Sequence, residues 1–250
     1  ERGAALLAKM RTGSQTLSDL SDRHALWGYV NAVGAKRAYN VCETFGWLWA
    51  HDLGAVLRTE RSRSLRVASV GGGPGCCLLG WAVFERLTLA AAEGAADAPP
   101  RLHVFDYAPG WAPLVERAAA ALGEPVGFAG CELTEGLAHA SNAALRATAA
   151  GLDVILLVYA LHEADHDRPG IDGGRPPRWK GLLLDLWDAA KPSTLFLIKD
   201  QGWVEALARE LLERERPGTV DSCVVPRAEG VRAAAHDSDG LFLVRRVSSS

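Results

Sequence analysis

The stretch that most constrains the fold is Leu65–Trp81, with the sequence LRVASVGGGPGCCLLGW. It predicts a short strand over Arg66–Val70, then a turn with glycines at 71, 72, 73 and 75, then an apolar helix. Such a turn lets backbone N–H groups approach a ligand and directs the start of a helix toward it. Because tight turns also need glycine for purely steric reasons, the turn alone does not identify a site.

A second strand that ends in an acid follows, with the sequence LHVFDY and Asp106 at its end. In nucleotide-binding α/β folds, a carboxylate in this place accepts hydrogen bonds from ribose hydroxyls about 20 residues after the glycine turn. The separation is longer here because Leu87–Pro100 is an insertion typical of a helix end and a loop. Two further strand ends follow in Phe128–Gly136 and Asp153–Glu163. This ordered series, more than the glycine turn, predicts a nucleotide-binding site.

Strands and helices alternate from Arg66 onward, which predicts an α/β fold with a doubly wound, mostly parallel, seven-stranded, Rossmann-like sheet. Residues 1–58 are expected to form an N-terminal helical extension, and residues 59–250 the nucleotide-binding domain. The aromatic residues of the extension either pack its helices onto the sheet or line a pocket, for which Tyr39 and Asn40 are the first candidates. The basic loop Ala164–Gly181 leaves a central strand, so we expect it to contact or gate the substrate.

This order of segments resembles the class I S-adenosylmethionine (SAM)-dependent methyltransferases, over roughly Arg66–Val247. VGGGPG is similar to their first motif, around the methionine and ribose of SAM, and FDY to the second, whose acid holds the ribose. GCELTEG resembles the adenine-contacting segment, and YALHE the fourth motif, between methyl donor and acceptor. The resemblance implies SAM as cofactor and S-adenosylhomocysteine (SAH) as product. It implies these cofactor-binding residues: Gly71, Gly72, Gly73, Gly75, Asp106, Tyr107, Cys131, Glu132, Leu133 and Tyr159.

Two local features bear on how such an enzyme would work. Many members of the family carry an acid two places before the first glycine, where this chain has Ser69, so contact with the SAM amino group must come from elsewhere or be weaker. The run LHEADHD resembles a segment of small-molecule O-methyltransferases whose histidine is the general base. By that resemblance His162 is the candidate base, with Glu163 as its orienter or a substrate contact. In the alternatives, His162 only hydrogen-bonds the loop, or transfer needs no base.

The same run also matches the H-E-x-x-H motif of zinc peptidases, through His162 and His166. That chemistry needs both histidines on one helix. The aliphatic residues before His162 favour a strand, and Pro169 would cut a helix short. A peptidase would also leave the glycine turn unexplained. We therefore expect no metal site here.

Composition narrows the class of protein further. The net charge of −3 argues against a nucleic-acid binder that works by bulk charge, although it leaves room for a local basic patch. Five cysteines without a C-x-x-C pair predict buried thiols in a reducing compartment, such as the cytoplasm, the nucleus or an organelle matrix. No apolar run reaches about 18 residues, so we expect no membrane span. The oligomeric state stays open.

The methyl acceptor is the least determined feature. Arg175 and Arg178 in the basic loop favour a phosphate-bearing acceptor, and YALHEA faintly resembles a segment of ribosomal-RNA uracil methyltransferases, so RNA is slightly favoured. A small-molecule O- or N-methyltransferase that uses His162 as base is the first alternative. The second is a methyltransferase fold kept as a non-catalytic binding or assembly subunit, which Ser69 and the absence of an acceptor motif would suit.

Overall fold

The computed structural model describes residues 2–12, 15–16, 18–50, 65–88, 101–165, 175–224 and 241–245. The helices are α1 (Arg2–Thr12), α2 (Arg23–Tyr29), α3 (Ala35–Ala50), α5 (Cys76–Thr88), α6 (Ala112–Leu122), α7 (Ala143–Ala149), α8 (Leu161–Ala164), α9 (Lys180–Ala189) and α10 (Gly202–Glu215), with short turns of other helix types at η1 (Asp19–Ser21), η2 (Val30–Gly34), η3 (Pro109–Trp111) and η4 (Ala140–Asn142). The strands are β1 (Val67–Val70), β2 (Leu102–Phe105), β3 (Val126–Ala129), β4 (Val154–Val158), β5 (Leu195–Lys199), β6 (Val220–Val224) and β7 (Leu241–Arg245).

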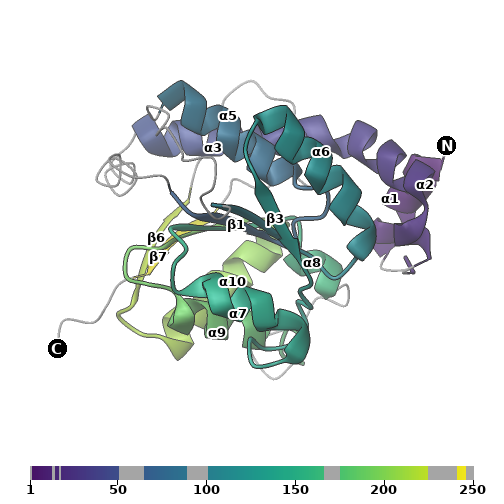
Figure 1. The fold of residues 1–250 in the computed structure, drawn as a ribbon. Helices are drawn as coiled ribbons and strands as arrows, with labels where there is room; N and C mark the ends of the chain where they lie inside the picture. Colours follow the sequence, from purple (N-terminus) through teal and green to yellow (C-terminus); the bar gives the residue numbers. More distant parts are fainter. Residues whose placement is uncertain are drawn as a thin grey trace.

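The strands form one sheet in the order β3-β2-β1-β4-β5-β7-β6. The pairs from β3 to β5 are all parallel, whereas β7 runs antiparallel to both β5 and β6. Helices α3, α5 and α6 cover one face and α7, α9 and α10 the other (Figure 1). The predicted α/β class, with a doubly wound, mostly parallel sheet and N-terminal helices, is therefore confirmed.

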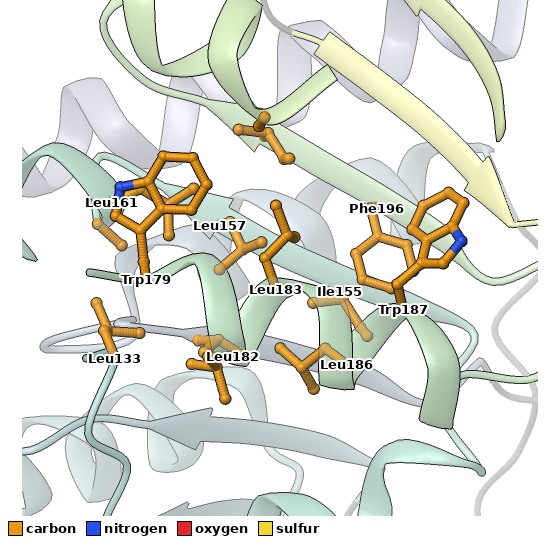
Figure 2. Packing of buried hydrophobic residues seen from close by; sticks show 14 of the residues in the cluster. Leu133, Ile155, Leu157, Leu161, Trp179, Leu182, Leu183, Leu186, Trp187 and Phe196 are labelled. Carbon is orange, nitrogen blue, oxygen red and sulfur yellow. The ribbon is translucent and has the colours of Figure 1, made fainter. Parts of the chain in front are cut away.

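Alternate side chains of the central strands fill two cores. On one face, Ile155 of β4 and Phe196 of β5 pack beneath α9, whose Leu182, Leu186 and Trp187 project onto them (Figure 2). The neighbouring residues of the same strands pack on the opposite face against α3 and α5. Because β4 is buried on both faces, its sequence VILLV is uninterrupted by polar residues, as the aliphatic run predicted.

The N-terminal helices pack against the α/β layer through apolar side chains. Phe45 of α3 is fully buried, with its ring centroid 4.8 Å from that of Trp81 in α5. The two helices cross closely, since a Cβ at Gly80 would lie 2.1 Å from the carbonyl oxygen of Ala38. Leu26 of α2 belongs to a separate cluster that includes Trp111, just after β2. The packing interpretation of these aromatics therefore holds for Phe45.

Helix α7 begins only at Ala143, although the alanine-rich segment that contains it starts at Ala138. The Asn142 amide donates to the carbonyl oxygens of Glu132, Glu135 and Gly136, which holds the chain in place before the helix starts. Some predictions fall outside the described residues: the domain boundary at residue 58, most of the insertion 87–100 and part of the loop 164–181. Among those residues, no helix is both long and apolar enough to cross a membrane.

Candidate active site

A cavity of about 440 Å³ opens where β1, β2, β3 and β4 end, at their carboxyl edge. Open α/β sheets bind ligands at this edge, outside the point where the strand order reverses between β1 and β4. The cavity is lined by Gln15, Gly71, Asp106, Tyr107, Cys131, Glu132, Leu133, Thr134, Ala160, Glu163, Ala164, Asp165, Arg175 and Arg178. The lining thus combines segments that follow four strands with one residue of the N-terminal extension.

The glycine turn and Asp106 form one hydrogen-bonded unit. Gly71 has a φ of +65°, and a Cβ there would lie 2.6 Å from the Cβ of Ala160, so a side chain would be both strained and obstructed. The Asp106 carboxylate accepts the N–H of Gly73 at 2.8 Å through Oδ2 and that of Ala108 at 3.0 Å through Oδ1. Asp106 is only 6% exposed, yet it lines the cavity. It therefore fixes the turn and still borders the cavity.

The charge on Asp106 depends on opposing influences. Burial raises the pKa of Asp106 to about 7, against the lowering effect of the N–H groups of Ala108 and Gly73. The nearby Glu163 carboxylate also raises this pKa, and the Arg37 guanidinium lowers it. The cavity thus contains an acid that titrates near neutral pH.

The segment after β3 forms another wall. Oε1 of Glu132 accepts the N–H of Thr134 at 3.2 Å and its hydroxyl at 2.9 Å, which closes a small turn. Burial raises the pKa of the Cys131 thiol to about 12, so it is neutral and unreactive at pH 7. This wall therefore combines the neutral Cys131 and Leu133 side chains with the polar Glu132 and Thr134.

His162 is turned away from the cavity and toward Asp200, the residue after β5. The His162 Nδ1 lies 2.6 Å from Oδ1 of Asp200, and Oδ2 of Asp200 accepts the N–H of Leu161 at 3.0 Å. Burial lowers the pKa of His162, but the hydrogen bond and charge of Asp200 outweigh burial and raise it. His162 is not among the lining residues, which fits the alternative in which it hydrogen-bonds its surroundings.

Glu163, one residue further on, does line the cavity and meets an arginine of the N-terminal helices. Its Oε1 lies 3.4 Å from the Arg37 guanidinium of α3. Burial raises the pKa of Glu163, and the positive charge of Arg37 opposes that shift. Sequence reasoning did not single out Arg37, because nothing in the pattern of α3 separates it from an ordinary surface arginine.

The predicted substrate arginines stand at the cavity, but one of them is already paired. Arg175 donates to Oδ1 of Asp165, and the backbone N–H of Arg178 donates to Oδ2 of Asp165 at 2.7 Å. Asp165 is 1% exposed, whereas the Arg175 side chain is 47% exposed. The acid therefore anchors this end of the loop beside the cavity.

The predicted site residues divide into two groups. Those that line the cavity are Gly71, Asp106, Tyr107, Cys131, Glu132, Leu133, Glu163, Arg175 and Arg178. Those that do not are Gly72, Gly73, Gly75, Tyr159, His162, Tyr39 and Asn40. Tyr39 is 58% exposed on α3, where its hydroxyl donates to Glu43 at 3.1 Å.

Sequence reasoning also missed residues at the site. Gln15, Thr134, Ala160 and Ala164 line the cavity without having been singled out. Asp165, at the start of the basic loop, lines it as well. Asp200 could have been found, because it follows a buried strand directly, as Asp106 does.

The zinc-peptidase motif lacks the helix that it needs. Helix α8, which carries His162, ends at Ala164, and Asp165 has a non-helical backbone with φ −148°. His166 lies outside the described residues. In the part of the chain that the structure describes, no group of three or more His, Cys, Asp or Glu side chains could hold a metal ion.

Comparison of the sequence with protein-family models and with curated proteins yields no match. Solved structures, by contrast, are similar in fold. An O-methyltransferase family protein from Burkholderia thailandensis matches 99% of this chain and 70% of its own, with a TM-score of 0.54 at 14% identity. The plantazolicin methyltransferase BpumL, solved with a substrate analogue and SAH, matches 98% of both chains, with a TM-score of 0.56 at 13% identity. Both similarities concern the fold.

Proposed function

We propose that this chain, which has the fold of the class I SAM-dependent methyltransferases, is itself a SAM-dependent methyltransferase. The observation that carries the proposal is Asp106, a buried acid at the end of β2 that holds the glycine turn by the N–H of Gly73 and lines the cavity. A carboxylate in this place is suited to the two ribose hydroxyls of a nucleoside. That BpumL was solved with SAH adds support.

The residues around the cavity fit SAM. Asp106 would accept the ribose hydroxyls, and Cys131, Glu132 and Leu133 would border the adenine. The turn at Gly71, Gly72, Gly73 and Gly75 would hold the amino-acid end, together with Tyr107 and Tyr159. The lack of a Cβ at Gly71 lets the turn pass close to Ala160 and Leu133, two other lining residues. When bound, SAM supplies an electrophilic methyl group on a sulfonium, so the chain's own task is to align the acceptor.

For an acceptor that must lose a proton, His162 is the proposed base. Asp200 accepts from Nδ1, which leaves Nε2 as the nitrogen that would take the proton. A base must be neutral before it acts, so activity would rise with pH through the raised pKa of His162. Since His162 does not line the cavity, a shift of α8 or a bridging water would have to complete the path.

RNA is the acceptor that we propose to test first, because Arg175 and Arg178 border the cavity. A small-molecule acceptor is the second candidate. It is favoured by the pairing of Arg175 with the buried Asp165, which offsets the charge that would attract phosphate. Residues Tyr39 and Asn40 would then contact the acceptor only through a rearrangement of α3.

The chain organisation is part of the same proposal. Residues 1–58 would act as a helical extension of a SAM-binding domain over residues 59–250. Cys42, Cys76, Cys77 and Cys131 are free thiols, which supports a reducing compartment as the site of action.

Calorimetric titration of the purified chain with SAM and with SAH tests the cofactor directly. We expect micromolar binding, which corresponds to about −8 kcal/mol. Transfer of a labelled methyl group to total RNA or to a small-molecule extract then separates the acceptors. Binding of both ligands without transfer to either pool would favour the non-catalytic subunit. No binding of either ligand would contradict the proposal.

A further inference from the structure

The acids of the cavity differ in how far protein donors already satisfy them. Both oxygens of Asp106 and both of Asp165 accept hydrogen bonds from the protein, and Glu132 accepts two from its own turn. Among the described residues, Glu163 has no backbone N–H or hydroxyl donor. Within the described chain, its one ion pair is with the Arg37 guanidinium, at the long distance of 3.4 Å. Glu163 is therefore the lining acid with the most capacity for a cationic ligand.

Glu163 lies close to the glycine turn as well as to Asp106. It comes one helical turn after Ala160, and the Ala160 side chain abuts the space over Gly71. Gly71, Ala160 and Glu163 all line the cavity. Ser69, two residues before Gly71, is 1% exposed and carries no charge. Asp106 already accepts the N–H of Gly73, so Glu163 is the acid at this end of the cavity that the glycine turn leaves available.

Arg37 is fixed in place by more than the ion pair. Its guanidinium carbon lies 5.4 Å from the ring centroid of Tyr29 and 5.4 Å from that of Tyr159. Tyr159 has an unusual positive φ of 53°, and its N–H donates to the carbonyl of Lys199 at 2.7 Å. The Arg37 side chain is 14% exposed and the Glu163 side chain 21%. A guanidinium held between two rings is a fixed positive charge that orients the Glu163 carboxylate and favours its ionised form against the effect of burial.

The amino-acid end of SAM carries an ammonium group at neutral pH, and a half-buried ammonium needs a charged acceptor. We propose that the Glu163 carboxylate accepts a hydrogen bond from this ammonium group. Arg37 is then the positioning residue that holds the Glu163 side chain in the orientation for this contact. The inference rests on the proposed function. It makes helix α3, in the N-terminal extension, a part of the cofactor site.

Three ligands test the contact by calorimetry: SAH, SAH without its α-amino group, and 5′-methylthioadenosine, which lacks the amino-acid end. The Glu163→Gln variant should bind SAH about 10- to 100-fold more weakly than the natural chain, as for the loss of a bond between charged groups. Its affinity for the deaminated ligand and for methylthioadenosine should be unchanged. Equal losses for SAH and the deaminated ligand, or no loss for SAH, would overturn the proposal.

The natural chain allows a test that needs no variant. It should bind SAH more tightly than the deaminated ligand, by a factor similar to the loss in Glu163→Gln. Equal affinity for the two ligands would overturn the proposal even if the variant failed to fold. Binding of none of the three ligands would instead refute the proposed function itself, so the two failures are distinguishable.

The positioning role of Arg37 is tested by a double-variant comparison. Arg37→Gln should weaken the binding of SAH but not that of methylthioadenosine. The double variant, with both Arg37→Gln and Glu163→Gln, should bind SAH no more weakly than Glu163→Gln alone. Additive losses, or an equal loss for methylthioadenosine, would show that Arg37 acts only on the fold. The control is Arg117→Gln. Arg117 lies 4.8 Å from the Trp27 ring centroid and is not a lining residue, so its replacement should leave all three affinities unchanged.

Discussion

Two buried aspartates, each directly after a parallel strand, have contrasting surroundings. Asp106 follows β2 and is 6% exposed, and Asp200 follows β5 and is 0% exposed. Both bond to backbone N–H groups, but Asp200 also accepts from the His162 ring and does not line the cavity. Asp106 lines the cavity and has no histidine or other cation within hydrogen-bonding distance in the described chain.

The difference follows from where each strand lies in the sheet. The cavity lies over the ends of β1 to β4, so the end of β2 borders open space. At the end of β5, the turn of α8 packs back over Asp200 and fills that space. The same sequence pattern therefore yields an acid that borders the cavity after β2 and an internal anchor after β5.

The largest expected effect is on stability, from Asp200→Ala. It would leave the N–H groups of Leu161 and Gln201 without their acceptor and the His162 ring without its partner. The expected loss is about 3–5 kcal/mol in the free energy of unfolding, as for a broken buried ion pair. Denaturant titration measures this loss, and Asp106→Ala is the matched control. The control should lose less stability because no cation offsets the burial of Asp106. A larger loss in the control would reverse the comparison.

His162→Asn separates the anchor from catalysis. The asparagine amide nitrogen lies near the position of the histidine Nδ1 and can still donate to Asp200, so the fold and the affinity for SAH should be retained. If His162 is the base, turnover should fall by at least about 100-fold. The test measures turnover at saturating SAM and the affinity for SAH by calorimetry. Full activity in the variant would show that His162 is not the base and that it serves only as part of the anchor.

Asp106→Ala tests the aspartate of the pair that lines the cavity. Losing the proposed ribose hydrogen bonds should weaken the binding of SAH by about 1.5–3 kcal/mol, as for bonds to a charged acceptor. Calorimetry measures the change, and thermal denaturation of the same sample shows whether the fold persists. Unchanged SAH affinity in a folded variant would remove Asp106 from the site.

How far the sequence predicts this molecule can be judged from particular residues. The strand positions and the position of the glycine turn follow from local patterns, since β-branched runs suit buried strands and glycine suits tight turns. The place of Asp106 directly after β2 follows from the same local patterns. Arg37 could not be found, because its pairing with Glu163 joins residues that lie far apart in the sequence. The contact depends on how α3 packs across α5, which no local pattern encodes.

His162 illustrates a different limit. The sequence indicates that His162 follows a central strand, but in the structure it lies in helix α8, four residues after β4 ends, and the direction of its ring depends on Asp200, which follows the next strand. The start of α7 at Ala143 has a similar origin, because the Asn142 side chain bonds to a preceding loop. Patterns locate such residues, and tertiary hydrogen bonds decide which way they point.

The affinity for SAH should depend on pH through Asp106. Because burial raises its pKa to about 7, Asp106 is largely protonated at pH 6 and ionised at pH 8, and only the ionised form is the strong acceptor. The affinity should therefore rise with pH, by at most about tenfold per pH unit below the pKa. Burial also raises the pKa of Glu163, so the Asp106→Asn variant is measured over the same pH range, and the part of the pH dependence that it loses belongs to Asp106. Equal affinities at pH 6 and pH 8 would contradict the prediction.

The smallest effect concerns the arginines at the cavity. If the acceptor is RNA, replacing Arg175 and Arg178 by Gln should reduce the slope of log affinity against log salt by about 0.7 for each phosphate of a single strand that the variant no longer binds. Arg214→Gln is the matched control, since its side chain is 47% exposed and ion-paired, as is that of Arg175. RNA binding measured across a salt series yields the slopes. An unaltered slope in the double variant would show that these arginines do not meet phosphate. Asp165 would then hold Arg175 as Asp200 holds His162, and a small-molecule acceptor would be favoured.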